Sequence, residues 1–179
     1  TGPDVFMVKN TWLPKHANKL APLDPTAMTV VNYGELFPQV VVKDFVKDGR
    51  IYAMPLYLDT LAILYNKNMF DAAGIAQIPK TWEEFNALVP QLRVIDQATG
   101  EIRTATAAIG GSPKNVNEAN DLLFQIMLQY GTELVNPEGT SSNFAQTGGR
   151  PLEYYLSFRN PRSEVYTWNR DMHYSIDAF

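Results

Sequence analysis

An almost continuously apolar run, Thr60-Leu61-Ala62-Ile63-Leu64-Tyr65, constrains the fold of this chain more than any other segment. A run with so little polar surface predicts an interior strand, in a sheet that is covered on both faces. A short helix is expected directly after it, from Lys67 to Ala73. Asn66 is suited to the N-cap of this helix and Gly74 to its end. The segment therefore predicts one strand-to-helix unit.

The rest of the chain continues this alternation. Apolar runs predict further strands at residues 3–8, 51–56 and 104–109. The spacing of apolar residues predicts helices at residues 13–20, 34–47, 81–92, 121–129 and 151–158, and a last one from Ser175 onward. Strands that alternate with helices indicate an α/β fold class.

Polar residues and glycines mark the boundaries of these elements. Asn10 is a candidate N-cap of the helix at 13–20, and Asn120 or a residue near it is the expected N-cap of the helix at 121–129. Asp48-Gly49-Arg50 is expected to form a turn before a strand, and residues 136–149 read as a polar loop. These positions divide the chain into short elements without an internal repeat.

The strongest helix start lies at Thr81. Glu84 follows it at the spacing of a capping box, in which the two residues satisfy each other's backbone donors. Glu83-Glu84 is the only adjacent acidic pair, but neighbours on a helix do not share a face. We therefore interpret the pair as part of a helix start and not as a catalytic pair. Pro90 conflicts with the last turn of the same helix.

Composition excludes several classes of protein. The formal net charge of -4 over 179 residues provides no basic field for nucleic acid. The absence of cysteine excludes a disulfide scaffold, a thiolate metal site and a cysteine nucleophile. His16 and His173 lack partners at zinc-motif spacing, so no metal and no cofactor is expected. Gly110-Gly111-Ser112-Pro113 lacks the lysine of a P-loop, and no nucleophile elbow is present. We therefore expect no catalytic residues and no enzyme activity.

Aromatic side chains are the more informative group. Trp12, Tyr57, Tyr130 and Trp168 fall at or near the ends of expected elements. Sugars present flat C–H faces that stack on such rings, so these residues are candidates for carbohydrate contacts. Packing in the core is the competing interpretation for each of them.

Two neighbouring motifs resemble a known family. Residues 55–67 read Pro-Leu-Tyr-Leu-Asp-Thr-Leu-Ala-Ile-Leu-Tyr-Asn-Lys, and residues 79–85 read Pro-Lys-Thr-Trp-Glu-Glu-Phe. This combination resembles family 1 extracellular solute-binding proteins, the relatives of maltose-binding protein. Residues 3–5, 121–134 and 168–179 resemble flanking segments of the same family. The resemblance covers most of the chain.

The resemblance implies a fold. The family has a periplasmic-binding-protein-like, type II architecture with two α/β lobes. Residues 1–58 are expected to form part of the first lobe and residues 59–179 part of the second. The chain is expected to be a fragment that is incomplete at both ends. Missing segments would leave apolar faces uncovered, so the fragment is expected to self-associate.

The resemblance also implies ligand-binding residues. Asp59 matches the family position at the lobe crossing where an acidic residue accepts hydrogen bonds from sugar hydroxyls, and Tyr57 lies beside it. Asn10 and Trp12 follow the first expected strand, where the family's first-lobe ligand loop lies. This loop departs from the maltose-binding pattern of adjacent acid and arginine. Glu118 and Asn120 begin the expected second-lobe helix.

The implied function is the substrate-binding component of an ABC importer that holds a carbohydrate or similar small polar solute in an interlobe cleft. Its expected partners are that solute and the permease subunits, and no nucleic acid. The expected location is periplasmic or extracellular, with a lipid anchor as one possibility. Amino acids, polyamines and metal chelates stay open as ligands because the family's ligands vary widely. The alternative function is a carbohydrate-active enzyme, for which Asp59 and Glu118 are the least implausible carboxylate pair.

Overall fold

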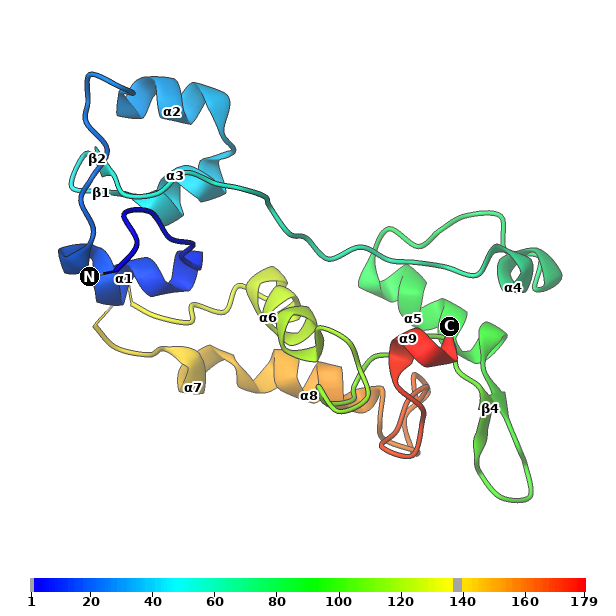
Figure 1. The fold of residues 1–179 in the computed structure, drawn as a ribbon. Coiled ribbons are helices and arrows are strands. Elements are labelled where there is room, and N and C mark those ends of the chain that lie inside the picture. Colours follow the sequence, from blue (N-terminus) through cyan, green and yellow to red (C-terminus); the bar gives the residue numbers. More distant parts are fainter. Residues whose placement is uncertain (1, 137–139) are drawn as a thin grey trace. The chain divides into compact units, whose positions relative to one another are not determined.

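The computed structural model describes residues 2–136 and 140–179. The chain divides into two compact units, Thr1–Thr60 and Leu61–Phe179, which we call the first and the second unit and describe separately (Figure 1). The elements of the first unit are η1 (Asn10–Trp12), α1 (Leu13–His16), η2 (Ala17–Lys19), α2 (Val30–Leu36), α3 (Gln39–Phe45), β1 (Val46–Lys47) and β2 (Arg50–Ile51). Those of the second unit are α4 (Lys67–Ala72), α5 (Trp82–Leu92), β3 (Val94–Ile95), β4 (Ile102–Thr104), α6 (Ala119–Gln129), α7 (Phe144–Thr147), α8 (Gly149–Ser157) and α9 (Ser175–Ala178).

The core of the first unit forms around Tyr33 on α2. Tyr33, Val41 and Ile51 are fully buried and pack together, which ties α2, α3 and β2 to one another. The Tyr33 hydroxyl donates a hydrogen bond to the carbonyl oxygen of Ala53 at 2.9 Å. Burial raises the pKa of this hydroxyl, so it stays a neutral donor. One tyrosine therefore supplies both packing and a polar anchor for the chain that leaves β2.

The single helix expected at residues 34–47 is wrong. The structure has two helices, α2 and α3, separated at Phe37 and Pro38. The residue before a proline is pushed out of the helical region by the proline ring. Phe37 accordingly has extended backbone angles, φ −122° and ψ 148°. Apolar residues continue at helical spacing across Phe37 and Pro38, but the backbone there cannot stay helical.

The turn expected at residues 48–50 is confirmed. Asp48 and Gly49 both have positive φ, 51° and 69°, and connect β1 to β2. Two positive φ values are typical of the type I′ turn of a two-residue hairpin. The strand that follows ends at Ile51, where the sequence predicts a strand as far as residue 56.

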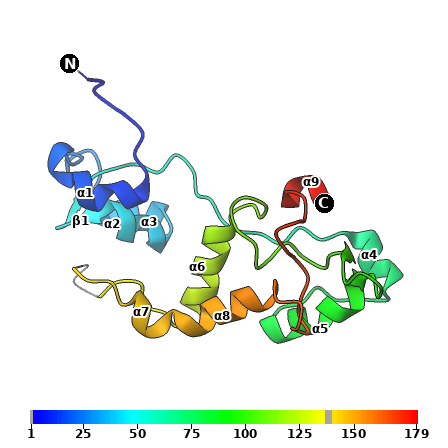
Figure 2. The ribbon, with the colours of Figure 1, turned by 90° about the horizontal axis from the view of Figure 1, so that it is seen from below.

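The core of the second unit lies between α5, α6 and α8. Its buried side chains are Val89, Ile109, Ile126, Tyr155 and Phe158. Helices α6 and α8 lie side by side in two perpendicular views (Figures 1 and 2). The cluster joins these three helices through buried apolar side chains.

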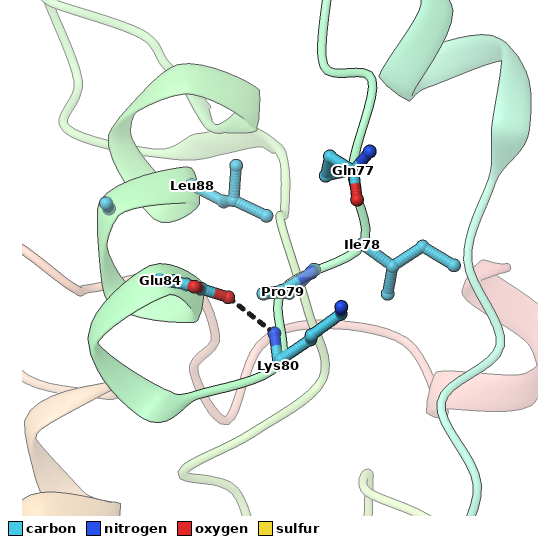
Figure 3. Close-up of a pocket in the computed structure, with 7 residues that line it drawn as sticks. Gln77, Ile78, Pro79, Lys80, Glu84 and Leu88 are labelled. Atoms are coloured by element: carbon cyan, nitrogen blue, oxygen red, sulfur yellow. Dashed lines mark hydrogen bonds between the residues drawn. The ribbon is translucent and has the colours of Figure 1, made fainter.

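The helix starts expected at Asn66 and Thr81 are confirmed. The Asn66 side chain accepts a hydrogen bond from the backbone N–H of Met69 at 3.2 Å. The Thr81 hydroxyl accepts one from the N–H of Glu84 at 3.2 Å. The Glu84 carboxylate reaches back to the N–H of Lys80 at 2.7 Å, one residue before the expected partner of a capping box (Figure 3). Side-chain chemistry alone therefore located both helix starts.

The conflict at Pro90 does not shorten α5. The helix continues through Pro90 and ends at Leu92. Proline has no N–H to donate to the carbonyl oxygen four residues before it, so α5 continues past Pro90 with one intrahelical hydrogen bond fewer.

The strand expected at residues 104–109 is much shorter in the structure. Only β4, Ile102–Thr104, forms, and it pairs antiparallel with β3. Beyond β4 the Thr167 hydroxyl accepts hydrogen bonds from the backbone N–H groups of Thr106 at 2.7 Å and Ala107 at 3.3 Å. A buried side chain thus replaces the neighbouring strand.

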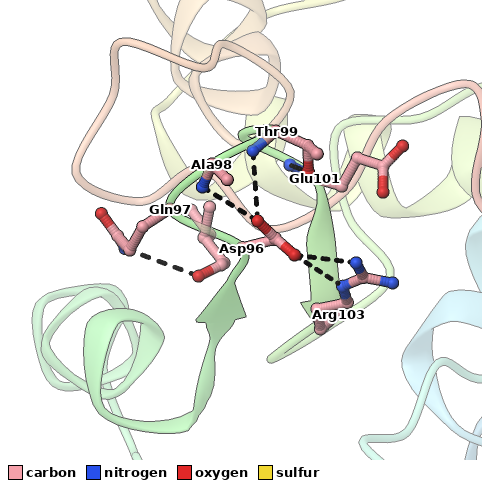
Figure 4. A network of polar contacts seen from close by, with 7 residues as sticks. Asp96, Gln97, Ala98, Thr99, Glu101 and Arg103 are labelled. Atoms are coloured by element: carbon pink, nitrogen blue, oxygen red, sulfur yellow. Dashed lines mark hydrogen bonds and ion pairs between the residues drawn. The ribbon is translucent and has the colours of Figure 1, made fainter.

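The loop between β3 and β4 is organised by Asp96 (Figure 4). Its carboxylate accepts hydrogen bonds from the N–H groups of Ala98 at 2.9 Å and Thr99 at 3.1 Å, and pairs with Arg103 at 2.7 Å. The Arg103 guanidinium, followed by these backbone donors, lowers the pKa of the Asp96 carboxyl. Arg103 is exposed and Asp96 is half-buried, and their contacts close the hairpin of β3 and β4.

Neither residues 3–8 nor residues 60–65 form a strand in the structure, which corrects the prediction of an interior strand at residues 60–65. Val5 is 88% exposed and Leu64 is 79% exposed. Both sheets of the described chain are antiparallel and two-stranded. An apolar composition indicates that the side chains of a segment favour burial. The segment forms a strand only where a neighbouring strand supplies its backbone hydrogen bonds. The α/β expectation therefore holds only as a mixture of helices with few strands.

The remaining elements lie near their expected places. Helix α8 begins at Gly149, two residues before the expected start, and α9 begins at Ser175 as expected. Part of the loop expected at residues 136–149 forms α7, and residues 137–139 of that loop lie outside the described residues.

Candidate functional site

Asn10 and Trp12 lie in η1, and both are exposed. Asn10 does not cap a helix as the sequence predicts, because the N-cap position of η1 is Lys9. Its side-chain amide instead donates a hydrogen bond to the carboxylate of Asp44 on α3 at 2.8 Å. Trp12 is 48% exposed, so part of its ring is accessible for stacking. The first unit thus presents an amide, a carboxylate and an indole on neighbouring elements.

Tyr57 and Asp59 lie in the irregular stretch that follows β2. Tyr57 is 73% exposed. One carboxylate oxygen of Asp59 accepts a hydrogen bond from the N–H of Thr60 at 2.9 Å, and the side chain is exposed. The Asp59 carboxylate is thus partly oriented by its own backbone while it stays accessible to a hydroxyl.

Glu118 and Asn120 lie at the start of α6. The expected cap is Asn120 or a residue near it; the N-cap residue in the structure is Glu118, and Asn120 lies within the first turn. Glu118 has left-handed backbone angles, φ 52° and ψ 33°, and its side chain does not cap the helix. A non-glycine residue in this region is strained, and such strain is found often at ligand sites. Both side chains are exposed.

Sequence reasoning missed the residues that hold this helix start. The Asn117 N–H donates to the hydroxyl oxygen of Ser175 at 2.9 Å, and the Tyr174 hydroxyl donates to the Asn117 side chain at 2.9 Å. Asn115 is buried, and its amide donates to the Asn169 carbonyl oxygen at 2.7 Å. Partners separated by more than fifty residues leave no signal in one sequence, although the Asn115 to Asn117 stretch is recognisably polar. These contacts fasten the residues that precede α6 to those that precede α9.

The other aromatic candidates are mainly structural. Trp168 is 3% exposed and packs against Val116 and Ala119, and its indole N–H has no partner within the described chain. Tyr130 is 48% exposed, and its ring packs on Tyr154 with centroids 5.8 Å apart. Burial raises the pKa of Tyr154 to about 12, so this hydroxyl remains a neutral donor. Core packing therefore accounts for Trp168, while Tyr130 keeps an accessible ring.

A hollow of about 370 Å³ lies between α5 and the residues that precede it in the second unit (Figure 3). Its lining is Gln77, Ile78, Pro79, Lys80, Glu84, Ala87 and Leu88. It is open and mainly apolar, and its one carboxylate already binds the Lys80 backbone. None of the six predicted ligand residues lines this hollow.

Over residues 2–136 and 140–179, no group of three or more histidine, cysteine or acidic side chains lies close enough to hold a metal ion. The carboxylates weighed as a catalytic pair, Asp59 and Glu118, belong to different units.

Comparison with known families identifies the chain. The family of bacterial extracellular solute-binding proteins matches residues 1–161, which is most of the sequence. The chain belongs to this family. The family resemblance deduced from residues 55–67 and 79–85 is therefore confirmed.

Individual proteins are also similar to this chain. A putative binding protein of Brucella abortus is 30% identical over 105 residues, which are 59% of this chain and 24% of that protein, and one of Brucella suis matches equally. The diacetylchitobiose binding protein DasA of Streptomyces coelicolor is 35% identical over 83 residues, 46% of this chain and 19% of DasA. The match with the Brucella proteins thus spans about a quarter of their length. No solved structure matches the chain.

The family description places its members outside the cytoplasm and gives them a binding role. Within the described residues, no helix is both long and apolar enough to cross a membrane.

Proposed function

We propose that this chain is part of the substrate-binding component of an ABC importer, and that it helps to bind a carbohydrate or a similar small polar solute. The match of the solute-binding family over residues 1–161 carries this proposal. The similarity to a protein named for binding diacetylchitobiose favours a sugar among the possible solutes. Solute binding needs no nucleophile and no acid–base pair, in agreement with the residue types of the chain.

The proposed site lies in a cleft between two lobes, to which residues 1–58 and 59–179 contribute. The division into compact units between Thr60 and Leu61 falls close to this boundary and supports it. Ligands of two-lobed proteins bind between the lobes, and lobe closure changes an outer surface that a transporter can recognise. The proposed partners are accordingly the permease subunits, at a periplasmic or extracellular location, where the protein is either free or held by a lipid anchor.

The proposed ligand residues are Asp59, Tyr57, Asn10, Trp12, Glu118 and Asn120. All six are exposed within their own units, as contact with a solute requires. Exposed rings such as Trp12 and Tyr57 suit the C–H face of a sugar. Carboxylates such as Asp59 form charge-assisted hydrogen bonds with hydroxyl groups, which are about twice as strong as neutral ones.

Carbohydrates are expected to stabilise the protein without being hydrolysed. A ligand that binds only the folded state raises the free energy of unfolding by about 2.7 kcal/mol at a hundred times its dissociation constant. Thermal unfolding is measured with diacetylchitobiose, maltose and glucose, with amino acids and polyamines as other ligand classes. Chromogenic glycosides are tested in parallel. Hydrolysis of a glycoside would favour the enzyme, and stabilisation by none of the sugars would remove the carbohydrate proposal.

In the full-length protein, Asp59→Ala is expected to weaken the binding of the stabilising sugar at least about tenfold, since a charge-assisted hydrogen bond contributes about 1.5–3 kcal/mol. Isothermal titration calorimetry measures the dissociation constant. The melting temperature should change little because Asp59 is exposed and packs in no core cluster of the described chain.

Asp71→Ala is the matched control, because Asp71 is an exposed aspartate on α4 outside the proposed site. Its dissociation constant should equal that of the unmodified protein. An unchanged constant for Asp59→Ala would exclude Asp59 from the ligand site.

A further inference from the structure

The side chain of Asn10 in η1 is tied to a carboxylate of another element in the same unit. Its amide nitrogen Nδ2 donates a hydrogen bond to Oδ2 of Asp44 on α3 at 2.8 Å. Asn10 is exposed, whereas Asp44 is half-buried. The two residues are 34 positions apart, so the bond is a tertiary contact and not a feature of one helix. Helix α3 therefore orients an exposed amide of η1.

Both partners of this contact are held by buried residues. Asp44 lies one turn beyond Val41 on α3, and Val41 is fully buried in the core of the first unit. The backbone carbonyl oxygen of Asn10 accepts a hydrogen bond from the N–H of Leu13, whose side chain is also buried. A side chain that is already held in this way loses little freedom when it meets a ligand.

The chemistry of the pair decides which end of the Asn10 amide stays available. A carboxylate only accepts hydrogen bonds, so the NH2 group of Asn10, and not its oxygen, must face Asp44. The amide oxygen Oδ1 is then directed away from Asp44. Connected hydrogen bonds polarise one another, so the charge of Asp44 also makes Oδ1 a stronger acceptor. The exposed end of Asn10 is therefore an acceptor that suits a donor such as a sugar hydroxyl.

We propose that Asp44 is a positioning residue of the solute site and acts through Asn10. It holds the Asn10 oxygen ready to accept a hydrogen bond from a solute hydroxyl and does not touch the solute itself. This inference rests on the proposed function, in which Asn10 is a ligand residue. Asp44 lies outside the segments that carry the family resemblance, so only the tertiary contact points to it.

A double-mutant cycle in the full-length protein tests this role. Isothermal titration calorimetry measures the binding of diacetylchitobiose, maltose or glucose, whichever stabilises the protein most. Asn10→Ala should weaken binding about tenfold, through the loss of one hydrogen bond. Asp44→Ala should weaken it about fivefold, because the amide remains but is free to turn away. In the Asn10→Ala background, Asp44→Ala should have less than about a twofold effect, since no amide is left to position.

Asp44→Asn is the conservative variant. It keeps an oxygen that can accept a hydrogen bond from Asn10, so its affinity should lie within about twofold of that of the unmodified protein. Glu35→Ala is the matched control for the loss of a carboxylate, because Glu35 is exposed on α2 of the same unit. It should leave the dissociation constant unchanged.

NMR relaxation of the Asn10 side-chain amide tests the contact without any solute. Asp44→Ala should raise the mobility of this amide, and Glu35→Ala should not. Unchanged mobility in Asp44→Ala would overturn the proposal, and so would an unchanged dissociation constant. Equal losses of affinity with and without the Asn10 amide, or equal losses for Asp44→Ala and Asp44→Asn, would also overturn it, since Asp44 would then act on the solute directly. Binding of none of the three sugars by the unmodified protein would instead overturn the carbohydrate proposal itself, and the role of Asp44 with it.

Discussion

Phe158→Ala is expected to lower the free energy of unfolding of the second unit by about 3–5 kcal/mol. Phe158 is fully buried, and its ring lies 5.2 Å from that of Tyr154 and 5.9 Å from that of Phe85, measured between centroids. Removing the ring leaves a cavity among rigid neighbours and costs both the transfer free energy and the lost packing. Urea unfolding followed by tryptophan fluorescence measures the loss, because Trp82 and Trp168 both lie in this unit.

Phe124→Ala is the matched control for this prediction. Phe124 lies on α6 of the same unit but is 44% exposed. Its replacement should cost at most about 1.5 kcal/mol, because much of the ring is already in water. Equal losses for the two variants would contradict the central place of Phe158 in the core.

Gly110→Ala is expected to destabilise the second unit by about 3 kcal/mol. Gly110 has φ +87°, and an added Cβ would lie 3.0 Å from the backbone nitrogen of Arg159, the carbonyl oxygen of Tyr155 and the Cβ of Phe158. Positive φ costs a non-glycine residue about 1–2 kcal/mol, and overpacking adds about 1–3 kcal/mol. Two of the three neighbours are backbone atoms of α8 and its C-terminal end, so they cannot move aside without distorting the helix. The same urea titration measures this loss.

Gly100→Ala separates the two causes. Gly100 has φ +74°, but a Cβ there would meet nothing within 4 Å. Its replacement should therefore cost only the backbone term, about 1–2 kcal/mol. If Gly110→Ala is no worse than Gly100→Ala, the close approach of α8 to Gly110 contributes nothing.

Local features of this fold could be predicted from the sequence. The caps at Asn66 and Thr81 and the turn at Asp48-Gly49 depend on side chains that bond to backbone atoms a few residues away. Such interactions are complete within a short segment and need no tertiary contact. The family motif at residues 55–67 is likewise contained in a short segment, and the comparison with known families confirmed the family.

The expected strands show the limit of this reasoning. Residues 60–65 have the composition of an interior strand, yet Ile63 and Leu64 are exposed and unpaired. The composition of a segment indicates which environment its side chains favour. A strand also requires a second strand, from another part of the chain, to form its backbone hydrogen bonds. At residues 104–109 the partner is the Thr167 hydroxyl instead of a strand, which no periodicity could indicate.

In the candidate site, too, some features follow from the sequence and others only from the tertiary structure. The sequence by itself determined the family, the residue types suited to a polar solute, the helix caps and the turn, because short-range chemistry and recognisable motifs specify them. Only the tertiary structure decided that Asn10 bonds Asp44, that Glu118 takes the strained N-cap position of α6, and that Trp168 is buried. These outcomes depend on which distant segments pack together. Packing is a property of the whole folded unit, so no short stretch of sequence contains it.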